Sequence, residues 1–196
     1  MMNIIDGSSK SFTEGEVFRE ELIGRMKAAS SKKNIFLTAP GGYGKTTAAA
    51  QWLGLLRKKT EKIVVRDSDN DAGVFYKRLA TPLLALAGKR KDTPRSSVNL
   101  DGLLKIIDNL PKRNARCYLI IDDLHILKND EMIRHLPALA KRLPFWVSLC
   151  LISRSEPSSA LLETGLFEVF TREDFLFTPK EVEYLGTEKE RNLTAC

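Results

Sequence analysis

The feature that most constrains the fold of this chain is a glycine-rich segment, APGGYG at residues 39–44, between two regular stretches. Before it, residues 34–38 (NIFLT) are apolar and include β-branched and aromatic side chains, which favours a strand. After it, residues 44–58 are rich in helix-forming residues. A strand, a tight loop and a helix in direct succession predict an α/β fold.

The loop carries the residue types that bind phosphate. It fits the phosphate-loop pattern when the first glycine of that pattern is relaxed to alanine. Its glycines allow the backbone to turn tightly and to aim N–H groups at an anion beside a helix N-terminus. We expect Lys45 to bridge phosphate oxygens and the Thr46 hydroxyl to ligate Mg²⁺. The alternative is a glycine-rich turn that contains a lysine by chance. The predicted nucleotide-binding residues of the loop are Gly41, Gly42, Tyr43, Gly44, Lys45, Thr46 and Thr47.

Two acidic residues follow a second apolar run. Residues 117–121 (CYLII) predict a buried strand, and Asp122 and Asp123 come directly after it. A pair of ionised carboxylates at the end of a strand is unfavourable without a cation nearby. We therefore expect Asp122 to hold Mg²⁺ through its water shell and Asp123 to orient or deprotonate an attacking water. The alternative is that both aspartates cap the next turn.

An arginine follows a third apolar run. Residues 147–152 (VSLCLI) predict a strand, and Arg154 comes two residues after it. Because the C-terminal ends of parallel strands meet at one edge of a sheet, we expect Arg154 to lie near the phosphate loop and to sense the γ-phosphate. The alternative is an ordinary surface arginine. His125, three residues after Asp122, is interpreted as packed beneath the loop rather than as a site residue.

Further alternation of helices and strands completes the predicted fold. The remaining strands are predicted at residues 63–66 and 166–170, and the remaining helices at residues 16–29, 72–87, 98–110, 131–143 and 179–189. Because the strands are apolar throughout, we expect one parallel sheet covered by helices on both faces, a three-layer α/β sandwich. Thr178 and Pro179 suit an N-cap and a first helical position. We therefore predict a phosphate-loop domain at residues 1–178 and the truncated start of a helical domain at residues 179–196.

Composition argues against several other classes of protein. The apolar fraction of 43% and the charged fraction of 29% are those of a globular domain. No apolar run approaches the roughly 18 residues that a membrane span requires, and the first residues lack a secretory signal. We therefore expect a cytoplasmic protein. The three cysteines are widely spaced and show no zinc-ligand pattern.

The net charge of +6 raises the question of nucleic-acid binding. The basic clusters fall at or just beyond the C-terminal ends of predicted helices, where cations offset the negative end of the helix dipole. These clusters are Arg57-Lys58-Lys59, Lys89-Arg90-Lys91, Lys112-Arg113 and Lys141-Arg142. We therefore favour helix capping over a stripe that binds nucleic-acid phosphates.

Together these motifs resemble the nucleotide-binding domain of the STAND class of P-loop ATPases. Within that class the chain is most similar to the MalT-like group of large, ATP-binding LuxR-type transcription regulators. The resemblance covers about residues 17–185. It rests on the strings VFREELIGRM, LTAPGGYGKTT with QWL, DSDNDAGVF, YLIIDDLHIL, LISRSEP and FLFTPKEV.

The resemblance implies a P-loop NTPase fold with a five-stranded parallel sheet of order 5-1-4-3-2. It implies ATP or ADP with Mg²⁺ as ligands, slow hydrolysis, and a resting ADP-bound state. It also implies an ATP-bound state that self-associates when an inducer is present. Val17 and Arg19 match the segment near the adenine, and Arg154 matches the arginine sensor. DNA would be bound only through a helix-turn-helix domain outside this sequence, which is interpreted as a fragment.

Two functions are compatible with these motifs. The first is the ATP-binding switch domain of a signal-responsive transcription regulator, acting as a weak ATPase. The second is a nucleotide-binding scaffold that holds ADP without significant turnover. A small-molecule kinase is disfavoured, because the chain has no arginine-rich lid segment and the aspartate pair suits the activation of water.

Overall fold

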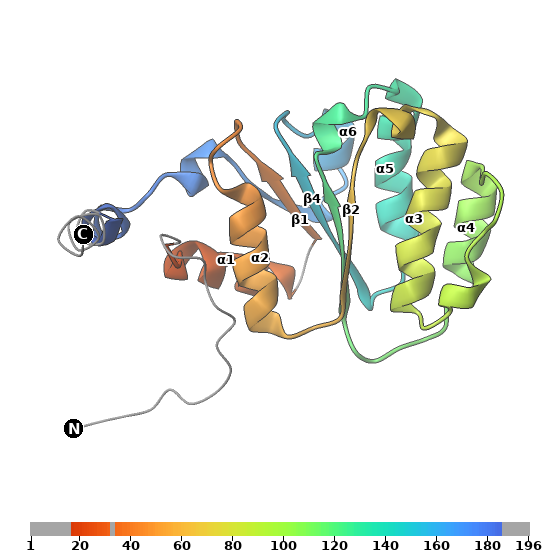
Figure 1. Ribbon diagram of the computed structural model, residues 1–196, viewed down its shortest axis with the longest axis horizontal. Helices are drawn as coiled ribbons and strands as arrows, with labels where there is room; N and C mark the ends of the chain where they lie inside the picture. The colour runs from red at the N-terminus through yellow and green to blue at the C-terminus, as the bar shows by residue number, and fades with distance from the viewer. Residues whose placement is uncertain (1–16, 32–33, 186–196) are drawn as a thin grey trace, which may run out of the picture.

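Five parallel strands form the centre of the molecule. The computed structural model describes residues 17–31 and 34–185. Its strands are β1 (Asn34–Thr38), β2 (Thr60–Val64), β3 (Cys117–Asp122), β4 (Val147–Ser153) and β5 (Phe167–Phe170). They lie in the order β2-β3-β4-β1-β5, and every neighbouring pair is parallel. This confirms the predicted order 5-1-4-3-2 and places β4 between the strands that carry the loop and the aspartates (Figure 1).

Helices cover both faces of the sheet and make a three-layer sandwich (Figure 1). One side holds α1 (Glu20–Ser30) and α2 (Lys45–Leu56), and the other holds α3 (Ala72–Leu86), α4 (Leu100–Asp108) and α5 (Asp130–Arg142). The shorter elements are α6 (Ser159–Leu162) and the 3₁₀ turns η1 (Asp67–Asn70), η2 (Arg90–Asp92), η3 (Leu124–Ile126) and η4 (Arg172–Phe175). None of the helices in the described ranges is long and apolar enough to cross a bilayer.

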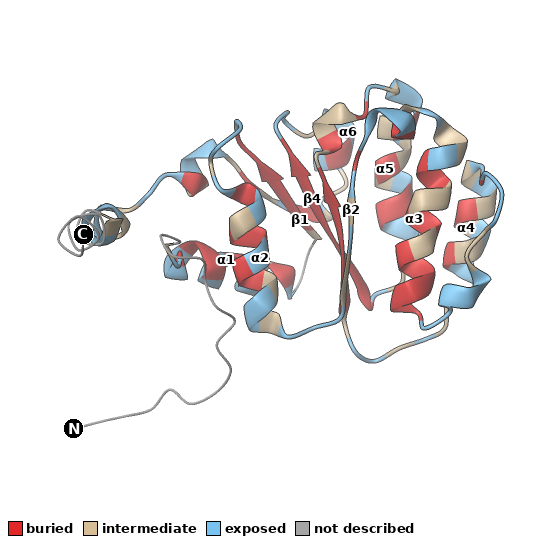
Figure 2. Cartoon of the chain, in the orientation of Figure 1, coloured by how far each residue is buried: buried red, intermediate tan, exposed pale blue. Residues whose placement is uncertain are grey.

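The central strands are buried on both faces. Side chains alternate along β3, so that Leu119 and Ile121 pack in the core beside α3 and α5, whereas Tyr118 and Ile120 pack in the core beside α1 and α2. Figure 2 shows the central strands buried along most of their length, whereas the longer helices carry both buried and exposed residues. Double burial explains why these strands appear in the sequence as continuous apolar runs.

Some boundaries differ from those predicted. β2 spans Thr60–Val64 rather than residues 63–66, because its pairing with β3 begins where Thr60 lies opposite Tyr118. It is an edge strand with only intermediate and exposed residues, so apolar side chains do not mark its length. α1 begins at Glu20, later than predicted, and residue 16 lies outside the described residues. Residues 179–185 are helical, as predicted, and residues 186–189 also lie outside the described ranges.

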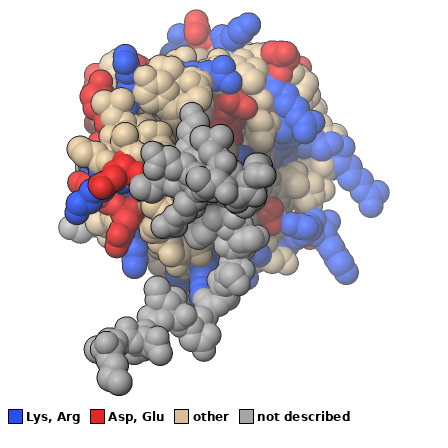
Figure 3. Space-filling view, turned by 60° about the vertical axis from the view of Figure 1, so that its left-hand side comes forward, with Lys and Arg blue, Asp and Glu red and all other residues tan. Residues whose placement is uncertain are grey.

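The basic clusters lie at helix ends, and two of their side chains cap one helix directly. Lys59 Nζ donates to the carbonyl oxygens of Ala85 and Leu86 at the C-terminal end of α3. Arg113 Nη1 donates to the same Leu86 oxygen at 2.7 Å. Each of these two side chains therefore caps α3 rather than the helix that its own cluster follows, which is α2 for Lys59 and α4 for Arg113. In space-filling view, Lys and Arg side chains gather on the right-hand side, and Asp and Glu are seen mainly at the left and top (Figure 3).

Candidate functional site

A cavity of about 220 Å³ opens at the C-terminal ends of β1, β3 and β4. It is where the topology brings the predicted motifs together, because parallel strands deliver their C-terminal ends to one edge of the sheet. The lining residues are Gly41, Gly42, Gly44, Lys45, Thr46, Thr47, Asp122, Asp123, Ile152, Ser153 and Arg154. The loop, the aspartate pair and the arginine thus face the same space, as the sequence predicted.

The loop leaves the start of α2 free of side-chain caps. Gly42 and Gly44 have φ values of +84° and +75°, a backbone conformation that glycine adopts without strain. Gly44 is the N-cap of α2 and provides no side chain to accept a hydrogen bond from the first N–H groups. By contrast, α3, α4 and α5 are capped by the side chains of Asp71, Asn99 and Asn129. The uncapped N–H groups of α2 are suited to an anion in the cavity.

Lys45 places a buried cation against the loop. Its Nζ donates to the carbonyl oxygens of Ala39 at 2.6 Å and Pro40 at 2.9 Å. Burial lowers the pKa of Lys45, and the nearby charge of Arg154 lowers it further, while Asp122 and Asp123 oppose the shift. No ion pair among the described residues includes Lys45. An anion in the cavity would provide the counter-charge that this ammonium lacks.

Asp122 and Thr46 bring two oxygen donors together. The Thr46 hydroxyl donates to Asp122 Oδ2 at 3.1 Å, and the Asp123 N–H donates to Asp122 Oδ1 at 2.9 Å. Hydroxyl and carboxylate oxygens are ligands that Mg²⁺ accepts, together with substrate phosphates and water. The described residues contain no cluster of three or more His, Cys, Asp or Glu side chains that could hold a metal ion alone. The donor set therefore fits a metal ion that arrives with phosphate.

Arg154 and His125 border this group. A Cβ atom added at Gly41 would lie 3.5 Å from Arg154 Nη1, so the arginine approaches the loop backbone closely. His125 Nδ1 is 4.0 Å from Asp123 Oδ1 and has no hydrogen-bond partner. Burial, and then the charge of Arg154, lower the pKa of His125. His125 does not line the cavity, which agrees with its interpretation as a packed histidine, but it lies beside the aspartate pair.

Three predicted nucleotide contacts, Val17, Arg19 and Tyr43, do not line the cavity. The Tyr43 ring lies beneath the guanidinium of Arg172, 5.7 Å from its carbon. Gln51 of α2 holds the N-terminal segment, because its Nε2 donates to the Val17 carbonyl at 2.9 Å and its Oε1 accepts from the Arg19 N–H at 3.3 Å. That Val17, Arg19 and Tyr43 contact a nucleotide stays a prediction.

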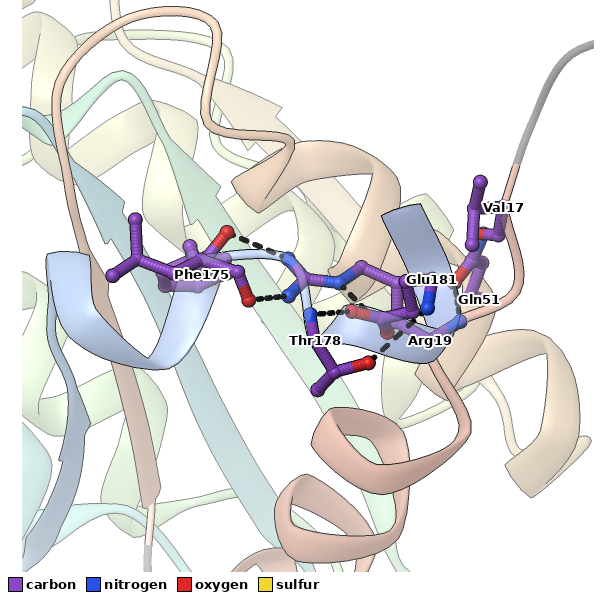
Figure 4. A network of polar contacts seen from close by, with 7 residues as sticks. Val17, Arg19, Gln51, Phe175, Thr178 and Glu181 are labelled. Atoms are coloured by element: carbon purple, nitrogen blue, oxygen red, sulfur yellow. Dashed lines mark hydrogen bonds and ion pairs between the residues drawn. The ribbon is translucent and has the colours of Figure 1, made fainter. Parts of the chain in front are cut away.

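The Arg19 side chain binds the segment after β5 (Figure 4). Its guanidinium donates to the carbonyl oxygens of Phe175 at 3.0 Å and Leu176 at 2.6 Å. It also pairs with Glu181 at 3.3 Å, and Glu181 in turn accepts from the Thr178 N–H at 2.7 Å. The N-terminal segment, α2 and the start of the helix at residues 179–185 are thereby joined.

Sequence reasoning missed Lys62, whose Nζ lies 2.7 Å from Asp122 Oδ2. Lys62 stands on the edge strand β2, and its position opposite β3 depends on the pairing register between the two strands. No local pattern marks that register, because β2 carries no regular alternation of apolar and polar residues. It also missed Ile152 and Ser153, which end β4 and line the cavity.

Comparison with known proteins assigns the family. The sequence profile of the AAA domain family matches residues 27–154, more than half of the chain. The HTH-type transcriptional regulator MalT of Vibrio parahaemolyticus is 27% identical over 148 residues, which cover 72% of this chain and 16% of the relative. MalT of Yersinia pestis is 27% identical over 152 residues, covering 74% and 17% respectively. The chain thus spans less than a fifth of the length of these relatives.

Solved structures share the fold. A Walker-type ATPase of Pyrococcus abyssi matches with a TM-score of 0.61 at 13% identity, covering 96% of this chain and 62% of that one. The Orc1 protein of Aeropyrum pernix, solved in complex with DNA, matches with a TM-score of 0.54 at 18% identity, covering 88% and 49%. At these identities the likeness shows a common fold alone. The profile match over residues 27–154 establishes that the chain belongs to the AAA domain family of P-loop ATPases.

Proposed function

We propose that this chain is the ATP-binding, slowly hydrolysing switch domain of a signal-responsive transcription regulator. The observation that carries the proposal is the cavity in which the Lys45 ammonium, the uncapped start of α2 and the Thr46–Asp122 oxygen pair face one another. A triphosphate with Mg²⁺ matches this arrangement in charge and in ligand chemistry. The similarity to MalT supports a role in transcription regulation.

Each residue of the site has a chemical role in this proposal. The N–H groups of residues 41–47 and the Lys45 ammonium bind the phosphates, and Thr46 and Asp122 hold Mg²⁺, which neutralises charge on the transferring phosphoryl group. Asp123 orients or deprotonates the attacking water, and Arg154 contacts the γ-phosphate. Val17 and Arg19 lie near the adenine. The roles of the loop, Asp122, Asp123 and Arg154 are supported by the phosphate-loop pattern and by their place around the cavity. The roles of Val17 and Arg19 rest on the resemblance to the MalT-like regulators.

The regulatory part of the proposal concerns the whole protein. ATP promotes self-association in the presence of an inducer, ADP marks the resting state, and a helix-turn-helix domain elsewhere binds DNA in the cytoplasm. Residues 1–178 form the nucleotide-binding domain, and residues 179–196 begin a helical domain. The Arg19–Glu181 ion pair ties the first helical turn after residue 178 to the N-terminal segment and, through Gln51, to α2. Such a link could carry a change at the loop to the next domain.

Calorimetry tests nucleotide binding directly. We expect the wild-type chain to bind ATP in Mg²⁺, and Lys45→Ala to weaken the affinity about 100-fold, because a charge-assisted contact to phosphate is lost. Lys105→Ala removes an exposed lysine of α4 and is the matched control. Equal affinities for wild type and Lys45→Ala would contradict the proposed binding mode.

A scaffold that holds ADP without turnover is the second candidate. One observation favours it: the Asp123 side chain is 39% exposed, and His125 Nδ1 lies as far as 4.0 Å from Asp123 Oδ1. A base held this loosely orients water poorly. Phosphate release by wild type and Asp123→Asn separates the two functions. We expect wild type to exceed the variant about 100-fold, the lower end of general-base effects, whereas equal background rates would favour the scaffold.

A further inference from the structure

A lysine from the edge strand contacts the aspartate that ends β3. Lys62 Nζ lies 2.7 Å from Asp122 Oδ2, the same oxygen that accepts the Thr46 hydroxyl at 3.1 Å. Asp122 is 5% exposed, whereas the Lys62 side chain is 38% exposed. One buried carboxylate oxygen therefore contacts both a hydroxyl group of α2 and an ammonium group of β2.

The strand register explains how Lys62 reaches this carboxylate. In the parallel pairing of β2 and β3, Lys62 lies opposite Ile120, two residues before Asp122. Residues two apart on a strand share a face, so Lys62 lies on the same face as Asp122. Its four-carbon side chain can span the rise of about 6.6 Å between those positions. The contact is thus set by backbone pairing and by the length of the lysine side chain.

We propose that Lys62 is an internal counter-cation of Asp122 that competes with Mg²⁺ for this carboxylate and so sets the Mg²⁺ concentration at which nucleotide binds. The inference rests on the proposed nucleotide function of the same cavity. A carboxylate paired with an ammonium group has its charge balanced without a metal ion. Mg²⁺ brought to the same oxygens would lie close to a like charge, which is unfavourable.

The position of Lys62 permits the exchange. β2 is an edge strand, and the partly exposed lysine can move its ammonium group into solvent without disturbing the sheet. Lys45 is not equivalent, because its Nζ is held by the Ala39 and Pro40 carbonyl oxygens rather than by Asp122. The two lysines therefore have separate roles: one binds the anion, and the other occupies the carboxylate that the cation needs.

A Mg²⁺ titration of nucleotide binding tests the proposal. The full chain is titrated with Mg²⁺ at a fixed concentration of a fluorescent ATP analogue. In Lys62→Met we expect the half-saturating Mg²⁺ concentration to fall about fivefold, the effect of removing a partly exposed ion pair. Lys62→Arg keeps the positive charge and should restore the wild-type value. Lys105→Met is the matched control at an exposed lysine of α4, and it should leave the value unchanged.

Stability in EDTA provides a readout that needs no nucleotide. Without Mg²⁺, Lys62→Met should lower the urea midpoint, because the buried Asp122 carboxylate loses its ammonium partner. In an Asp122→Asn background the same substitution should have no further effect, since a double-mutant cycle isolates the pair. Additive effects of the two substitutions would show that Lys62 stabilises the fold independently of Asp122, and would overturn the proposal.

The outcomes separate this inference from the function on which it rests. If wild type binds the analogue and Lys62→Met leaves the half-saturating Mg²⁺ concentration unchanged or raises it, Lys62 does not compete with the metal, and the inference alone fails. If wild type binds no nucleotide at any Mg²⁺ concentration, the proposed function fails and the inference fails with it.

Discussion

Gly44 and Gly54 both have room for a side chain, but they differ in backbone conformation. Gly44, the N-cap of α2, has a φ of +75°, whereas Gly54 lies within α2, outside the left-handed region. A Cβ atom added at either position would meet no atom within 4 Å. Substitution by alanine at each position therefore tests the backbone and not the packing.

We expect Gly44→Ala to lower the free energy of unfolding by about 1 kcal/mol, because an L-residue is strained in the left-handed region. Gly54→Ala should raise it by about 0.5–1 kcal/mol, since alanine loses less conformational entropy in a helix. Urea denaturation without nucleotide measures both changes. A Gly44→Ala variant as stable as wild type, or more stable, would show that the loop tolerates other backbone conformations at residue 44.

His125 makes stability depend on pH. Burial, and then Arg154, lower its pKa below the ordinary value of 6.5. Between that value and its pKa in the folded chain, the unfolded state binds the proton and the folded state does not. This histidine therefore costs stability as the pH falls below 6.5, with no cost above it.

His125→Gln removes the titrating group and keeps a polar side chain. We expect the free energy of unfolding of this variant to fall less than that of wild type between about pH 7.5 and about pH 5.5, the range in which histidine titrates. Urea denaturation at the two pH values gives the comparison. Parallel losses in both proteins would assign the acid sensitivity to other groups.

At the scale of elements, Arg19 joins the two ends of the described chain. Its side chain is 8% exposed, and it binds two carbonyl oxygens after β5 together with Glu181. Its guanidinium also lies over the Phe177 ring, 4.9 Å from the centroid. Arg25, one turn and a half along α1, instead pairs with Asp174 while 54% exposed. The two arginines differ in burial and should differ in their contribution to the free energy of unfolding.

We expect Arg19→Met to lower the free energy of unfolding by about 2 kcal/mol, because buried carbonyl oxygens and a carboxylate lose their donor. For a chain of this size that corresponds to a melting temperature lower by about 4–8 °C. Arg25→Met, the control, should cost less than about 1 kcal/mol, as exposed ion pairs do. Calorimetric melting of both variants checks the difference. Equal losses of stability in the two variants would show that the buried Arg19 contributes no more to folding than the exposed Arg25.

At the scale of the whole molecule, ligand binding adds to folding stability. A ligand at about 100 times its dissociation constant stabilises the folded state by about 2.7 kcal/mol. We therefore expect saturating ATP with Mg²⁺ to raise the melting temperature by about 5–10 °C. Lys45→Ala at the same ligand concentrations should show little of this rise. A wild-type melting temperature that does not change on addition of ATP and Mg²⁺ would argue against the proposed site.

The features set by residues close together in the sequence were predictable from the sequence. The strand, loop and helix around Lys45, and the aspartates after β3, are local patterns, and the parallel sheet brings them to one edge. The resemblance to a known class provided the strand order, which local patterns do not contain.

The missed or displaced contacts are long-range. Arg19 Nη1 donates to an oxygen 156 positions away, and Lys62 meets Asp122 only through the register of β2 on β3. Neither contact leaves a periodic pattern in the sequence, because each joins single polar side chains of elements that are close in space but distant in sequence. Sequence reasoning therefore located the cavity, with Lys45 and Arg154, but not the Lys62–Asp122 pair or the contacts of the Arg19 side chain.

The placement of β4 between β1 and β3 has a consequence for tolerance to mutation. The ends of β1 and β3, which carry the loop and the Asp122 carboxylate, stand two strand spacings apart, about 10 Å. Main-chain pairing across three strands maintains this separation. Substitutions in the loop can therefore change the affinity while the two strand ends that carry the loop and Asp122 keep their mutual distance.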